Sequence, residues 1–171
     1  MYHIVKDNYP QVTLRALNSS DYLVASKWLM DKEVAKYVRW NVYKDIDSVK
    51  KFFEEELHKY AYFKGIYFGN ELIGSITLQK GTGEAACRAS LGFVLSRDFW
   101  GKGIATKAVK TVISRGFEEL KICRIDAIID PRNIASRRVC EKSGMVQEGY
   151  LKNYIVRNTI LYDRILFATY K

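Results

Sequence analysis

The chain is poor in proline, cysteine and histidine, and the shortages of cysteine and histidine each exclude a class of protein. Its 171 residues include two prolines, three cysteines and two histidines. An odd number of scattered cysteines excludes a disulfide framework and favours reduced thiols in a cytoplasmic setting. Two isolated histidines with no cysteine beside them lack any zinc-binding spacing, so we expect no metal.

Long apolar runs are also missing, and this bears on where the chain works. No run approaches the about 20 residues that span a bilayer, so we expect no membrane partner. The first residues, MYHIVKDNYPQ, lack the basic and then apolar order of a secretory signal. No repeat, linker or low-complexity stretch divides the chain, and its length is sufficient for one hydrophobic core. We therefore predict a single cytoplasmic domain over residues 1–171.

Positive charge is in excess and is unevenly placed. The net charge is +9, and residues 97–142 carry eleven basic against six acidic side chains. A polyphosphate ligand or a nucleic acid would explain this excess, and a solvated basic surface is the plainer alternative. No nucleic-acid-binding motif is present, so the sequence disfavours nucleic acid as a partner.

The most informative stretch is 91–108, LGFVLSRDFWGKGIATKA. An apolar run typical of a buried strand leads into Gly101 and Gly103, and from Ala105 the apolar residues follow helical spacing. A glycine loop that opens a helix directs several backbone N–H groups at one point, where the helix dipole is also positive. The stretch therefore predicts a phosphate site, although its spacing is neither GxGxxG nor GxxxxGK[ST].

The rest of the chain alternates strand and helix patterns. Besides 91–95, strands are expected over 12–16, 62–68, 71–78, 122–129, 145–154 and 160–170. Helices are expected after the capping residues 18–21, over 32–36, after Asp45 or Asp47, from 105 to 120 and over 133–143. This order predicts a compact α/β (α+β) unit with a right-handed crossover after the strand at 91–95.

Four segments together carry a family resemblance. They are VTLRALNSSD at 12–21 with the following Arg39-Trp40, ELIGSI at 71–76, FWGKGIATKA at 99–108 and NIASRRVCEKSGM at 133–145. The chain resembles the GNAT superfamily of acetyl-CoA-dependent N-acetyltransferases, and within it the Rim-type branch that acetylates ribosomal-protein N-termini. The resemblance implies the GNAT fold, a mixed and mostly antiparallel sheet of about seven strands with helices on both faces.

The resemblance also implies a site for acetyl-CoA, the acetyl donor. Backbone groups of Phe93, Val94 and Leu95 would pair with the pantetheine arm, and an N–H near Val94 would polarise the thioester carbonyl. Asn133 would hydrogen-bond the arm, and Ser136 would sit near the sulfur.

The glycine loop would hold the pyrophosphate in this scheme. Arg97 and Lys102 are candidate partners of the phosphates. The loop residues concerned are Trp100, Gly101, Lys102, Gly103, Ile104, Ala105 and Thr106.

One departure from the family pattern concerns the general base. Ser90 stands where many relatives carry a glutamate, and a serine cannot act as a base alone. Asp163 on the last strand is the first substitute, beside Asp130, Glu71 and Glu84. The expected catalytic set is therefore Ser136, Val94 and Asp163.

The acceptor would be a primary amine, first a protein N-terminal α-amine and next a small-molecule amine. Arg39-Trp40, Tyr150 and Tyr154 are its expected contacts. A catalytically weak acyl-CoA-binding module is a further alternative, and either a monomer or a homodimer is compatible with the chain. We expect Cys87, Cys123 and Cys140 to be small core hydrophobes.

Overall fold

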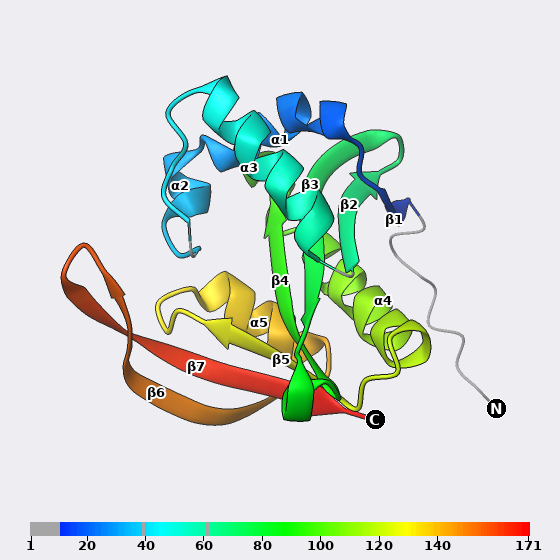
Figure 1. Cartoon of the computed structure of the whole chain (residues 1–171), viewed down its shortest axis with the longest axis vertical. Coiled ribbons are helices and arrows are strands. Elements are labelled where there is room, and N and C mark those ends of the chain that lie inside the picture. Colours follow the sequence, from blue (N-terminus) through cyan, green and yellow to red (C-terminus); the bar gives the residue numbers. More distant parts are fainter. Residues whose placement is uncertain (1–10, 39, 61) are drawn as a thin grey trace.

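The protein is built around one mixed sheet (Figure 1). The computed structural model describes residues 11–38, 40–60 and 62–171, and of His58 the backbone only. The described residues form seven strands in the order β1-β2-β3-β4-β5-β7-β6, antiparallel except where β4 meets β5, which confirms the predicted fold class. The strands are β1 (Val12–Ala16), β2 (Tyr62–Phe68), β3 (Glu71–Lys80), β4 (Arg88–Leu95), β5 (Arg124–Ile129), β6 (Val146–Arg157) and β7 (Ile160–Tyr170).

Helices begin where the sequence supplies capping residues or glycine. Asp45 caps α3 by accepting a hydrogen bond from the Ser48 amide at 2.7 Å. The α4 helix follows Gly103, whose φ of 75° suits glycine, and no side chain caps its first turn. The helices of the described residues are α1 (Tyr22–Leu29), α2 (Lys32–Ala35), α3 (Ile46–Lys59), α4 (Ile104–Glu119) and α5 (Ile134–Lys142). None of them is long and apolar enough to cross a membrane.

Two buried clusters lie on the two faces of the sheet. Trp28 of α1 and Phe53 of α3 pack with Val94 on one face. Val109 of α4 packs with Ile76 on the other. Figure 1 shows α1 to α3 on one side of β2 to β4 and α4 on the opposite side. Helices therefore cover both faces, as the sequence predicted.

The sheet opens between β4 and β5. The two parallel strands pair only where 88–90 meets 124–126, at one end of each strand. Beyond Ser90, β4 stays paired with β3 as far as Leu95, while β5 pairs with β7. The second half of β4 therefore has an edge without a neighbouring strand, and Figure 1 shows the two strands diverging.

The last two strands form a long hairpin that extends past α5 in Figure 1. The sequence placed the end of the sixth strand at Tyr154, whereas β6 continues to Arg157. A register shift between Leu151 and Ile155 interrupts the pairing with β7, and Asn153 has a φ of 51° there. Pairing resumes after this irregularity, so the predicted boundary was wrong by three residues.

The cysteines are not all in the core. Cys140 is fully buried on α5, as predicted. Cys87 and Cys123 are exposed, so that prediction was wrong for both. Each directly precedes a strand, β4 or β5, and so lies in a connection rather than inside the sheet.

Candidate functional site

Two cavities adjoin β4 near the opening of the sheet. The loop cavity, of about 450 Å³, lies against the glycine loop, α4 and α5. The α3 cavity, of about 420 Å³, lies against α1, α3, β3 and β4. The residues that line both are Tyr37, Val38, Phe93, Val94, Asn133 and Ser136. A ligand in one cavity can therefore meet a ligand in the other across β4 and the start of α5.

The glycine loop has the geometry of an anion site. Gly101 and Gly103 have φ of 74° and 75°, which turns the chain sharply into α4. No side chain of the described residues is seen to cap α4, and its first residues, from Ile104 to Thr106, line the loop cavity, as at a helix N-terminus that binds an anion. Trp100 fixes the loop to the sheet by donating its Nε1–H to the Leu95 carbonyl at 2.9 Å. Of the predicted loop residues, these three and Ile104 to Thr106 line the cavity.

The direction of the β4 amides refines the expectation for Val94. The Ser96 amide donates to the Ile73 carbonyl at 2.7 Å, so this pair bonds across β3 and β4. Backbone groups alternate in direction along a strand, so Val94 also faces β3. Accordingly, a Cβ on Gly74 of β3 would lie only 2.2 Å from the Val94 carbonyl oxygen.

The N–H groups that face the opening are therefore those beside Val94. By the same alternation, Phe93 and Leu95 direct their backbone groups away from β3. The bond from Trp100 to the Leu95 carbonyl lies on that side. The Val94 amide is thus wrongly oriented to polarise a carbonyl in the opening, while those of Phe93 and Leu95 are correctly oriented.

The start of α5 brings two polar side chains to the meeting point of the cavities. Asn133 caps the helix, its Oδ1 accepting from the Ser136 amide at 3.0 Å. That bond occupies the carbonyl oxygen of the Asn133 amide and leaves Nδ2 as its donor. Both residues line both cavities, so the structure brings this predicted pair together with β4.

The basic residues at the loop cavity differ from those singled out in the sequence. Arg97 pairs with Asp31, Nε to Oδ2 at 3.3 Å, and Lys102 donates to the Asp98 carbonyl at 2.9 Å. Neither lines the cavity. The basic side chains that do are Lys36, Arg138 and Lys142. The last two are four residues apart on α5 and so share a helix face, a spacing that was visible in the sequence.

The lining of the α3 cavity is rich in aromatic residues and includes two carboxylates. Trp40, one of the expected acceptor contacts, lines it, and so does Ser90. Arg39 lies outside the described residues. The acidic residues of its lining are Glu56 on α3, which the sequence reasoning missed, and Asp130 after β5.

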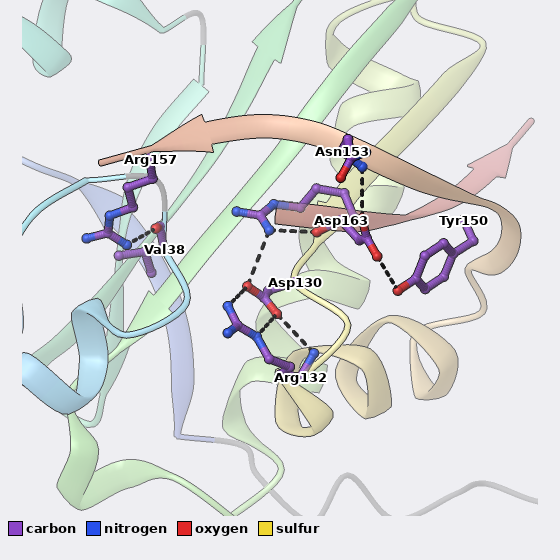
Figure 2. A network of polar contacts seen from close by, with 8 residues as sticks. Val38, Asp130, Arg132, Tyr150, Asn153, Arg157 and Asp163 are labelled. Carbon is purple, nitrogen blue, oxygen red and sulfur yellow. Dashed lines mark hydrogen bonds and ion pairs between the residues drawn. The ribbon is translucent and has the colours of Figure 1, made fainter. Parts of the chain in front are cut away.

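Asp130 is fully engaged by arginines, as Figure 2 shows. Its side chain is 3% exposed and accepts from Arg132 at 2.9 Å and 2.7 Å and from Arg164 at 3.3 Å. Burial alone would raise the Asp130 pKa, but the hydrogen bonds from Arg132 and the two positive charges outweigh it and hold the pKa below its usual value. Asp130 is therefore an ionised anchor rather than a proton acceptor.

Asp163 does not line either cavity. It accepts from the Tyr150 hydroxyl and from the Asn153 amide, both at 2.8 Å (Figure 2). The Asn153 bond, followed by that of Tyr150, lowers its pKa. These bonds close the irregular part of β6, which gives Asp163 a structural task. The geometry thus disfavours the predicted catalytic role of Asp163.

Other predicted positions also lie away from the cavities. Tyr150 and Tyr154 are half-exposed on β6 and line neither. Glu71 and Glu84 are exposed and likewise absent from both linings. No three histidine, cysteine or carboxylate side chains of the described residues are grouped so as to hold a metal ion.

Comparisons with known proteins agree with this geometry. Residues 11–146 match the acetyltransferase (GNAT) domain family. The probable N-acetyltransferase YjcK of Bacillus subtilis is 36% identical over 119 residues, 68% of this chain and 66% of that protein. A GNAT-family acetyltransferase structure from Bacillus anthracis superposes with a TM-score of 0.85 at 28% identity, covering 94% of this chain and 95% of that one.

The fold is shared with an enzyme whose structure contains coenzyme A. RimL, a ribosomal L7/L12 alpha-N-protein acetyltransferase in complex with coenzyme A, gives a TM-score of 0.81 at 20% identity, with 94% of each chain covered. The family match, the sequence relative and the fold lead to one conclusion: the chain belongs to the GNAT family and is an N-acetyltransferase.

Proposed function

We propose that the protein transfers the acetyl group of acetyl-CoA to a primary amine, first of all a protein N-terminal α-amine. The observation that carries this proposal is the open edge of β4, where Phe93 and Leu95 direct their backbone groups away from β3; Phe93 lines both cavities and Leu95 lines the loop cavity. One cavity has an uncapped helix start and three basic side chains, which suit the phosphates of a coenzyme A. The other, the α3 cavity, is accessible to the acceptor amine.

In this arrangement the nitrogen of the neutral amine attacks the thioester carbonyl carbon directly. A C–N bond forms, the C–S bond breaks and the amine loses one proton. The amides of Phe93 and Leu95 pair with the pantetheine arm, and one of them donates to the carbonyl oxygen as charge develops on it. One such donor contributes about 3 kcal/mol to transition-state stabilisation, and alignment of the two reactants contributes on the order of 7–11 kcal/mol at best.

The remaining residues bind and orient the donor. The Nδ2 of Asn133 donates to the arm, and Ser136 lies beside the departing sulfur. Because a thiol with a pKa of about 8.5 leaves readily as the thiolate, protonation of the sulfur contributes little. The loop from Trp100 to Thr106, together with Arg138 and Lys142, binds the phosphates.

The preference for a protein N-terminus is supported by the fold shared with RimL, which acts on such an amine. A small-molecule amine is the second candidate, favoured by the aromatic residues in the lining of the α3 cavity. A protein that binds acetyl-CoA but acetylates nothing would be the third.

Calorimetric titration of acetyl-CoA tests the donor site. We expect micromolar binding to the wild-type protein and its loss in Gly103→Glu, which places a carboxylate where the pyrophosphate binds. Gly149→Glu is the matched control, since a side chain there meets no atom within 4 Å and adds the same charge far from the loop. Absence of binding to the wild-type protein would refute the proposal. Binding without acetylation of any N-terminal peptide or small amine would leave only the third candidate.

A further inference from the structure

The α3 cavity needs a group that holds the acceptor amine, and Ser90 carries no charge. Of the described side chains that line the cavity, only Glu56 and Asp130 are acidic. Asp130 is already neutralised by Arg132 and Arg164. Glu56 is thus the carboxylate left to meet an ammonium or amine group.

The position of Glu56 allows it to bind an ammonium or amine group. The residue is 9% exposed although its type is usually solvated, and it occupies the inner face of α3 between Phe53 and Tyr60. Its Oε1 pairs with the Lys59 ammonium at 3.1 Å. The Lys59 side chain is 56% exposed and also lines the α3 cavity, so this partner lies where the cavity meets solvent. Its Oε2 accepts no hydrogen bond from the described residues.

Aromatic rings form a large part of the wall of the cavity that Glu56 lines. Two of the rings, Phe53 and Phe63, contact each other with centroids 5.7 Å apart, and Trp40 and Phe52 lie at 6.4 Å. Aromatic faces bury an apolar body and also attract a cation. The aromatic residues that line the cavity are Trp28, Tyr37, Trp40, Phe52, Phe53, Tyr60, Phe63 and Phe93.

From one available carboxylate within aromatic walls we infer that Glu56 binds the amine of the acceptor, and that this acceptor carries a single positive charge on an apolar, preferably aromatic, body. The inference rests on the proposed function and, of its two candidate acceptors, favours the small-molecule amine. A polyamine fits poorly, because its further charges would meet the Lys59 ammonium, and Asp130, the other carboxylate of the lining, is already paired with two arginines.

Binding can be measured without acetyl transfer. Trp28 and Trp40 line the α3 cavity, so their fluorescence reports on an occupant. We expect 2-phenylethylamine to change the emission, ethylamine to bind more weakly for lack of a body, and spermidine to bind weakest. Tighter binding of spermidine than of 2-phenylethylamine would overturn the inference.

Glu56→Gln keeps the shape of the side chain and removes its charge. Because a hydrogen bond to a charged group is worth about tenfold to a hundredfold in affinity, we expect the Kd and KM for 2-phenylethylamine to rise by that factor while acetyl-CoA affinity stays constant. Glu56→Asp should fall between the two. Glu55→Gln, on the exposed side of the same turn, is the matched control and should change neither.

The outcomes separate this inference from the proposed function. If the wild-type protein binds 2-phenylethylamine through Glu56 but forms no acetylated product, the transferase proposal fails and the acceptor site stands. If products form but Glu56→Gln behaves like Glu55→Gln, the acceptor site is refuted and the transferase proposal stands. Thermal melting of each variant verifies that it is folded.

Discussion

The Arg157 guanidinium donates through Nη2 to the backbone carbonyl of Trp40 at 3.2 Å, and thereby joins the end of β6 to a segment 117 residues earlier. The same group binds the Asn41 side chain at 2.8 Å and the Val38 carbonyl at 3.5 Å, and Figure 2 shows the latter. Val38 lines both cavities and Trp40 the α3 cavity. The long hairpin thus fixes the wall of the candidate site.

Replacing Arg157 should therefore weaken binding of the acceptor in the α3 cavity. We expect Arg157→Ala to raise the acceptor KM severalfold and to lower the free energy of unfolding by about 1–2 kcal/mol, from the lost hydrogen bonds. Steady-state kinetics and urea unfolding measure the two effects. Lys152→Ala, an exposed change on the same strand, is the control. Equal kinetics for the two variants would show that the hairpin does not position this wall.

Gly74 sets the position of β4. A Cβ there would lie 2.2 Å from the Val94 carbonyl oxygen and 2.7 Å from the Leu95 side chain, so Gly74→Ala must push β4 toward the opening. We expect a loss of about 1–3 kcal/mol of stability from overpacking and weaker acetyl-CoA binding, because the amides of Phe93 and Leu95 are displaced. Calorimetry compares this variant with Gly149→Ala, which has free space. Unchanged acetyl-CoA affinity would contradict the assigned amides.

Local patterns explain how much of the fold could be predicted. The glycine loop before α4 and the capping Asp45 before α3 act within a few residues of themselves, so the chain order specified both. The end of β6 could not be placed, because the Asp163 bond that lets the strand resume after Asn153 comes from a neighbouring strand. Cross-strand hydrogen bonds leave no trace in local periodicity.

The sequence predicted the acetyl-CoA side of the candidate site, at the loop cavity, better than the acceptor side, at the α3 cavity. The loop residues follow one another in sequence, whereas the direction of the Val94 amide depends on its register with β3. Glu56 had a sequence signal, since it falls at the inner-face spacing of Val49, Phe53 and Tyr60. A charged residue on that stripe could have been singled out. Its place in the same cavity as Ser90 required the tertiary structure.

The ion pairs of Asp130 with Arg132 and Arg164 predict a contribution to the free energy of unfolding that depends on pH. Because the Asp130 pKa in the folded protein lies below the value of 3.8 expected when unfolded, its stabilisation is present above that pH and is lost as the pH falls through the folded pKa. Asp130→Asn should cost about 3 kcal/mol at pH 7, since it leaves the buried Arg164 with less compensation. The difference should shrink below pH 3.8. Urea unfolding at several pH values measures it, and a constant difference would contradict this account.

The three thiols should react in an order set by burial. Desolvation raises the pKa of the Cys140 thiol to about 12, so that about one molecule in ten thousand is a thiolate at pH 8 and the buried sulfur is also inaccessible. The exposed Cys87 and Cys123 should alkylate in the folded protein, and Cys140 only after unfolding. A hydrogen bond to Cys87 raises the pKa of Cys123, so Cys87→Ala, which removes this partner, should accelerate alkylation of Cys123. Peptide mass spectrometry after timed iodoacetamide treatment follows each site. Labelling of Cys140 at the rate of Cys123 would show that the α5 side of the core opens readily.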